Sequence, residues 1–157
     1  MVAKALQDHG FDSSAGAGTP QALREDPDLK ASLASLQTAF DGLAPKLEKN
    51  SKDINKGRFS LGDSVADFPP GAQADALVFV RTRGAALTGG KQAFGILVAG
   101  PTRSRIDMVI TVVDARSGEV LYLTKFFGLG NFVENPDGVL GKKVKNSIKK
   151  LRAVNKT

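Results

Sequence analysis

The spacing of apolar residues predicts a long amphipathic helix over 27–49. Apolar side chains recur there at intervals of three and four residues, which is the period of one helix face. Asp26 followed by Pro27 is typical of a helix start, and Pro45 inside the pattern predicts a kink or break near residues 42–44. The apolar positions of this helix are Leu29, Leu33, Leu36, Phe40, Leu43 and Leu47.

A second amphipathic helix is predicted at the C-terminal end, from Asn135 and Pro136 to about Ala153. Its apolar stripe occupies roughly a third of the helix circumference, so we expect this stripe to pack on a sheet. The stripe consists of Leu140, Val144, Ser147, Ile148 and Leu151. One flank of the same helix carries Lys142, Lys145, Lys149, Arg152 and Lys156.

Three segments between the helices have the composition of strands. Residues 74–83 (ADALVFVRTR) are apolar on both faces at their start, which predicts a central strand. Residues 105–114 alternate so that one face is dry, and residues 119–127 are again rich in apolar and β-branched side chains. The segment 85–100 fits a strand and a short buried helix equally well.

A turn is predicted between the last two strands. Asp114 is a turn-forming residue at its first position, and Gly118 stands where a positive φ is needed, so the strands form an antiparallel hairpin over about 105–127. The elements together predict an α+β fold, with a three- to four-stranded, mainly antiparallel sheet and amphipathic helices packed chiefly on one face. The length fits a single domain over 1–157, in which residues 1–20 are a flexible segment or a partial helix and loop.

The composition excludes most classes of catalytic site. The chain has no cysteine and one histidine, which excludes a zinc cluster, a disulfide framework, a cysteine nucleophile and any triad that needs a second histidine. The segment 85–92 imitates a phosphate-binding loop, but Gln92 stands where serine or threonine would bind magnesium. Gly62, Asp63 and Ser64 resemble the nucleophile block of GDS-type esterases, which need a late histidine as base.

The remaining polar residues on strands and helices also have structural explanations. Ser147 and Lys150 match a Ser-x-x-Lys pattern by chance, because Ser147 belongs to the buried stripe. Of the strand carboxylates, Asp114 is explained by the turn and Asp107 by pairing with a neighbouring arginine. Only Asp75 then has no structural explanation, and an acid and base pair or a cation site would need two carboxylates. We therefore expect a non-enzymatic protein with no catalytic, cofactor or metal site.

The formal net charge of +6 is concentrated in two parts of the chain. Seven basic residues and no acid lie between Lys142 and Lys156, and five basic residues and no acid lie between Ala76 and Ile106. A basic helix of this kind is a solvated face or a surface that contacts phosphates. The candidate interaction surface consists of Arg81, Arg83, Lys142, Lys145, Lys149 and Arg152.

Nucleic-acid binding through the basic C-terminal helix is the less favoured explanation of these positive residues. The chain has no tryptophan, and we expect no arrangement of Phe79, Phe126 and Phe127 that is suited to stacking bases beside the positive residues. No apolar run is long enough for a membrane span. Met1 falls inside a predicted helix, as expected if an upstream signal or lipid-anchor segment had been removed.

Three short motifs carry a resemblance to a known group. They are Ala74-Asp75-Ala76, the hairpin sequence from Val113 to Tyr122 (VDARSGEVLY) and Gly57 to Gly62 (GRFSLG). The chain resembles the small α/β domain of bacterial envelope lipoproteins, over about Arg58 to Arg152. This domain is similar to the curli-secretion lipoprotein and to the N-terminal domain of the Tol-system propeller protein. Ser117 replaces a threonine and Tyr122 a tryptophan of that pattern, and its first strand is missing.

The resemblance implies a periplasmic domain, or one at the inner face of the outer membrane, without enzymatic activity or cofactor. Its partners would be other envelope proteins or a second copy of itself, bound through the sheet edge that the missing strand leaves exposed. Attachment to a membrane would require an anchor that this sequence does not contain.

Overall fold

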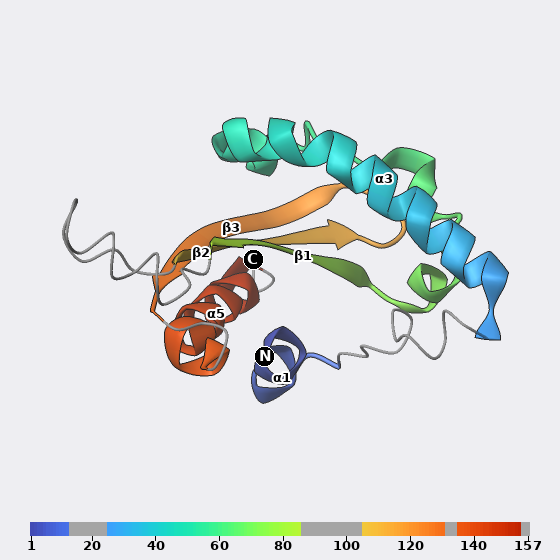
Figure 1. Ribbon diagram of the computed structural model, residues 1–157. Helices are drawn as coiled ribbons and strands as arrows, with labels where there is room; N and C mark the ends of the chain where they lie inside the picture. The colour runs from blue at the N-terminus through green and yellow to red at the C-terminus, as the bar shows by residue number, and fades with distance from the viewer. Residues whose placement is uncertain (13–24, 86–104, 131–134, 155–157) are drawn as a thin grey trace. The chain divides into compact units, whose positions relative to one another are not determined.

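The computed structural model describes residues 1–12, 25–85, 105–130 and 135–154. Its three strands form an antiparallel sheet in the order β1-β2-β3, so β2 is the central strand (Figure 1). The α+β class and the hairpin are thus confirmed. In chain order the elements are α1 (Val2–Asp8), α3 (Pro27–Lys49), η2 (Ser51–Lys56), η3 (Gly62–Val65), η4 (Pro69–Gln73), β1 (Ala76–Ala85), β2 (Arg105–Asp114), β3 (Val120–Leu129) and α5 (Pro136–Val154), where η denotes a 3₁₀ helix.

The chain divides into two compact units. The α5 unit consists of Met1–Ser13, Arg81–Val109 and Lys125–Thr157, and the α3 unit of Ser14–Val80 and Ile110–Thr124. Each strand contributes residues to both units. The expectation of a single domain stays a prediction.

Helix α3 begins where its sequence predicts. The Asp26 carboxylate accepts a hydrogen bond from the Leu29 amide at 2.9 Å, and Pro27 occupies the first turn, where its missing amide costs nothing. Of the predicted kink or break near residues 42–44, the break is wrong, because α3 continues through Pro45 to Lys49, and the kink stays a prediction. Pro45 is exposed, while Ala44 and Leu47 on either side of it are buried and hold the last turns in place.

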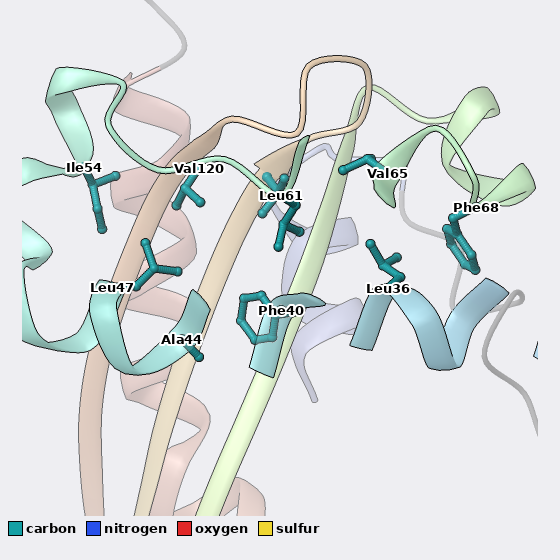
Figure 2. Packing of buried hydrophobic residues seen from close by; sticks show 10 residues of the cluster. Leu36, Phe40, Ala44, Leu47, Ile54, Leu61, Val65, Phe68 and Val120 are labelled. Carbon is teal, nitrogen blue, oxygen red and sulfur yellow. The ribbon is translucent and has the colours of Figure 1, made fainter. Parts of the chain in front are cut away.

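The core of the α3 unit lies under the apolar face of α3. Figure 2 shows side chains from this helix converging with others from the 3₁₀ segments and from β3. Within the core the Phe40 ring stacks on Phe79 of β1, with 4.1 Å between ring centroids and 12° between planes. The buried cluster consists of Leu36, Phe40, Ala44, Leu47, Ile54, Leu61, Val65, Phe68, Val113 and Val120.

The sequence of β1 predicts a central strand. In the described sheet β1 instead lies at an edge. Leu77 and Phe79 pack against the core under α3, whereas the alternate residues Val78 and Val80 are 36% and 42% exposed. The apolar run suggested two buried faces. In the α3 unit, β1 buries only the face that carries Leu77 and Phe79.

Strand β2 shows the opposite departure. Its sequence predicts one dry face, yet Thr111 and Val113 on one side are as buried as Ile110 and Val112 on the other. A central strand is enclosed by neighbours on both edges, and packing on both faces makes even a threonine inaccessible to water.

Helix α5 buries the stripe that its sequence predicts. All five stripe residues are 0 to 8% exposed, and Asn135 caps the helix by accepting a hydrogen bond from the Gly138 amide at 2.8 Å. Helix α1 contacts α5, and its Ala5 and Leu6 are buried. The stripe consists of Leu140, Val144, Ser147, Ile148 and Leu151.

Close packing between β3 and α5 depends on Gly128. A Cβ atom at this position would contact Val139 and would lie 2.8 Å from Leu140 Cδ2. Sequence analysis missed this glycine, although an isolated glycine in a strand is a known sign of close backbone approach.

Leu151 offers a test of the α5 packing. Its side chain is 7% exposed, so Leu151→Ala is expected to lower the free energy of unfolding by about 2–4 kcal/mol, because it removes buried methyl groups and leaves a cavity. Urea denaturation measures the change, with Lys149→Ala on the exposed side of the same helix as control. Equal stability of the two variants would contradict the orientation of the helix.

Candidate interaction surface

The turn between β2 and β3 is organised by one carboxylate. Asp114 Oδ1 accepts hydrogen bonds from the Arg116 amide at 2.9 Å, the Ser117 amide at 2.7 Å and the Ser117 hydroxyl at 2.9 Å. Gly118 has a φ of +71° and donates from its amide to the Asp114 carbonyl at 3.0 Å. The predicted turn and its left-handed glycine are confirmed.

These bonds change the acidity of Asp114. The Ser117 amide, the Ser117 hydroxyl and the Arg116 amide stabilise the carboxylate and lower its pKa below the usual value of 3.8. Because the folded protein has the lower pKa, the unfolded chain binds more protons in acid, and the contribution of Asp114 to stability is lost as the pH falls through that lowered pKa.

Asp114→Asn tests this contribution. The free energy of unfolding of the wild-type protein is expected to fall more steeply between pH 5 and acid conditions near pH 2 than that of the variant, which has no carboxylate to protonate at this position. Urea denaturation across this range gives both curves. Parallel pH profiles would contradict the role of Asp114.

The segment 57–62 closes over the turn. The Leu61 amide donates to the Gly118 carbonyl at 2.9 Å, the Val120 amide donates to the Phe59 carbonyl at 2.9 Å, and Ser60 pairs with Glu119 in an antiparallel bridge. The Ser60 hydroxyl donates to the Ser117 carbonyl at 3.2 Å. This segment therefore covers the outer edge of β3 at its start.

The start of β1 reaches the same turn. The Ala115 amide donates to the Asp75 carbonyl at 3.1 Å, and Arg116 lies 3.8 Å from the Asp75 carboxylate in an exposed ion pair that is worth little energy. We call residues 57–62, 74–76 and 113–122 the hairpin junction. All three motifs of the resemblance lie in the hairpin junction. Hydrophobic periodicity does not predict that they contact one another.

The residues of the near-motifs serve the local structure. The half-buried Ser64 hydroxyl donates to the Leu61 carbonyl at 2.7 Å, and the Ser147 hydroxyl donates to the Lys143 carbonyl at 2.9 Å. Arg105 Nε donates to both carboxylate oxygens of Asp107 at 3.0 Å, which lowers the pKa of Asp107 as its predicted pairing implies. The phosphate-loop imitation lies almost wholly within 86–104, outside the described residues.

The six predicted interaction residues belong to two elements of the α5 unit. On β1, Arg81 is half-buried and Arg83 is exposed. The lysines are exposed on α5, and Lys145 forms a 3.8 Å ion pair with Asp8, the last residue of α1. Arg152 lies in α5, but its side chain is outside the described part of the structure. The lysines concerned are Lys142, Lys145 and Lys149.

Phe127 lies beside positive charge, whereas the expectation that the phenylalanines are not arranged to stack bases stays a prediction. The Phe127 ring is 44% exposed, and Arg105 and Lys143 stand over it, with 4.8 Å from Arg105 Cζ and 4.6 Å from Lys143 Nζ to the ring centroid. Lys143 Nζ also donates to the Phe127 carbonyl. The sequence did not predict this arrangement, because its three residues lie far apart in the chain, at the end of β3, at the start of β2 and in α5.

The outer edge of β1 is open in the described sheet. No described strand pairs with it, and Val78 and Val80 present large apolar side chains to solvent along it. β1 has ten residues and contains no proline, so it lacks two common protections of an edge strand. Arg81 and Arg83 are its charged residues.

Among the residues that the structure describes, no group of three or more histidine or acidic side chains is placed to hold a metal ion. None of the described helices is both long enough and apolar enough to cross a membrane.

Comparison of the chain with protein-family models, with curated proteins and with solved structures found no match.

Proposed function

We propose that this chain is a non-enzymatic interaction or assembly domain of the bacterial cell envelope. The observation that carries the proposal is the edge of β1, where exposed valines lie on a side of the strand that no other strand of the described residues pairs with. Such an edge binds other polypeptides by main-chain hydrogen bonding. Its partners are other envelope proteins or a second copy of the chain.

The hairpin junction supports the envelope assignment. The three motifs that carry the resemblance to envelope lipoproteins are separated in the sequence but meet through backbone hydrogen bonds, so the resemblance concerns one structural unit and not scattered residues. The location proposed is the periplasm or the inner face of the outer membrane.

The local roles of polar groups support a function without catalysis. Ser64, Asp107 and Asp114 each take part in a bond that stabilises a turn or an ion pair, and none is positioned by a histidine as a nucleophile or base requires. We therefore propose that the chain acts through its surfaces.

Site-specific crosslinking in cells tests this function. A photoreactive amino acid is placed at Val78 on the edge of β1 and, as matched control, at Gln37 on the exposed side of α3. The Val78 protein is expected to form covalent adducts with another polypeptide in the envelope fraction, and the Gln37 protein is not. Absence of adducts from both positions, or recovery of the protein outside the envelope fraction, would overturn the proposal.

Nucleic-acid binding is the second candidate, because one observation favours it. A half-exposed ring beside cations, as at Phe127 with Arg105 and Lys143, is a combination found in sites that bind single strands. Under this alternative, retention on nucleic acid falls with salt, and neutralising Lys145 and Lys149 to glutamine reduces the slope by roughly two contacts. Equal retention of the variant at every salt concentration would remove this candidate.

A further inference from the structure

Helix α5 presents four exposed lysines along one side of its surface. Lys142 lies seven residues before Lys149, which places the two in line along the helix, about 10 Å apart at the usual rise per residue. Lys143 and Lys150 form a second row in the same way, and the exposed, neutral Asn146 lies between the rows. We call these four lysines the lysine flank.

The described part of the chain does not neutralise the charge of the lysine flank. Asp137 is the only acid in the sequence of α5, and it belongs to the first turn, before the flank begins. Lys145, which is not part of the flank, pairs with Asp8 at 3.8 Å. None of the ion pairs between described residues includes a lysine of the flank.

Two exposed apolar side chains lie beside the flank, at the end of β3. Phe127 is 44% and Leu129 50% exposed, and they share a face because they are two residues apart in the strand. Lys143 joins them to the flank, since its Nζ lies 4.6 Å from the centroid of the Phe127 ring and donates to the Phe127 carbonyl. Arg105 also stands over this ring, but its ion pair with Asp107 adds no net charge. All of these residues belong to the α5 unit.

Lysines beside an aromatic and an aliphatic side chain are suited to the surface of an anionic lipid bilayer. Each ammonium group is attracted to the lipid phosphates, while phenylalanine and leucine side chains enter the boundary between headgroups and acyl chains. A single strand of nucleic acid fits less well, because a base stacks on the face of a ring and cations already stand over the face of Phe127. Leu129 has no ring on which a base could stack.

We infer that the lysine flank, together with Phe127 and Leu129, binds the anionic surface of a lipid bilayer. The inference goes beyond the proposed function, which concerns the edge of β1, and shares with it only the location in the cell envelope. The contact is peripheral and reversible because it consists of surface side chains, and it is distinct from attachment through an anchor.

Co-sedimentation of the full chain with lipid vesicles tests the role of charge. Vesicles of one part phosphatidylglycerol to two parts phosphatidylcholine are expected to bind the protein at least tenfold more tightly than vesicles of phosphatidylcholine alone at low ionic strength. Salt at about 0.5 M is expected to remove most of this preference, because it screens the attraction between lysines and phosphates.

Two double variants of equal net charge locate the contact. Lys142→Gln with Lys149→Gln is expected to weaken binding to the anionic vesicles at least tenfold. Lys30→Gln with Lys46→Gln removes the same charge from the exposed surface of α3, and its affinity is expected to stay within about twofold. All four side chains are exposed, so circular dichroism is expected to show that both variants are folded.

Leu129→Trp reports on the apolar part of the contact. The chain has no tryptophan of its own, so the emission of this variant arises from position 129 alone. Anionic vesicles are expected to shift the emission to shorter wavelength, and lipids brominated in the upper part of the acyl chains are expected to quench it, because the indole leaves water for the bilayer interface. Gln37→Trp on the exposed side of α3 is the control and is expected to show neither change.

The results separate this inference from the proposed function. Equal binding to the two kinds of vesicle, equal losses in the two double variants, or unchanged emission of Leu129→Trp overturns the inference. Tighter binding to single-stranded oligothymidylate than to the anionic vesicles, at equal phosphate and salt concentration, makes nucleic acid the occupant and likewise overturns it. In each of these cases envelope adducts from Val78 would leave the proposed function standing.

Discussion

Replacing Phe40 by alanine is expected to lower the free energy of unfolding by about 3–5 kcal/mol. The side chain is 4% exposed and its ring stacks on Phe79, so the substitution removes a large apolar surface and an aromatic contact together. For a chain of this length the loss corresponds to a fall in the melting temperature of roughly 10 °C. Thermal and urea denaturation measure the change.

Two further variants show whether the aromatic position is what matters. Phe40→Leu restores most of the buried volume and is expected to cost clearly less than Phe40→Ala. Gln37→Ala, one turn away on the exposed side, is expected to change stability by no more than about 0.5 kcal/mol. A loss below about 1 kcal/mol in Phe40→Ala would contradict the packing of α3 on β1.

The second large effect is expected at Gly118. Valine there must adopt a φ of +71°, a strain of roughly 1–3 kcal/mol, and its Cβ would lie 2.8 Å from the Gly62 carbonyl oxygen and 2.9 Å from the Gly62 nitrogen. Backbone atoms cannot move aside as a flexible side chain does, so crowding adds to the strain. The total expected for Gly118→Val is about 2–5 kcal/mol.

Gly62 provides a matched control for the crowding. It also has a positive φ, of +57°, but a Cβ there meets no atom within 4 Å. Gly118→Ala is therefore expected to destabilise by at least about 1 kcal/mol more than Gly62→Ala, because strain is shared and crowding is not. Equal losses in the two alanine variants would show that the segment 57–62 does not press on the turn.

Local signals in the sequence predicted the individual elements well. Asp26 and Asn135 cap their helices, Asp114 and Gly118 form the turn, and the stripe from Leu140 to Leu151 is buried. Each of these features depends on hydrogen bonds or periodicity within a few residues, which the order of residues alone specifies. Pro45 is the exception, since packing of the neighbouring turns keeps α3 continuous there.

Much less of the candidate site was visible in the sequence. The basic residues of β1 and α5 were recognised by their charge. An exposed sheet edge was expected from the resemblance, but hydrophobic periodicity did not place it at β1, because the apolar run ADALVFV is typical of a strand enclosed on both sides. The cations over Phe127 were likewise missed, since Arg105 and Lys143 come from other elements.

The sequence by itself determined the helices, the strands and the hairpin of this protein, together with the position of its positive charge. Tertiary structure decided the strand order that leaves β1 at an edge, the closure of segment 57–62 over the turn and the close approach of α5 at Gly128. The physical reason is the range of the interactions: caps, turns and stripes are encoded by neighbours along the chain, whereas strand order and backbone approach depend on residues that only folding brings together.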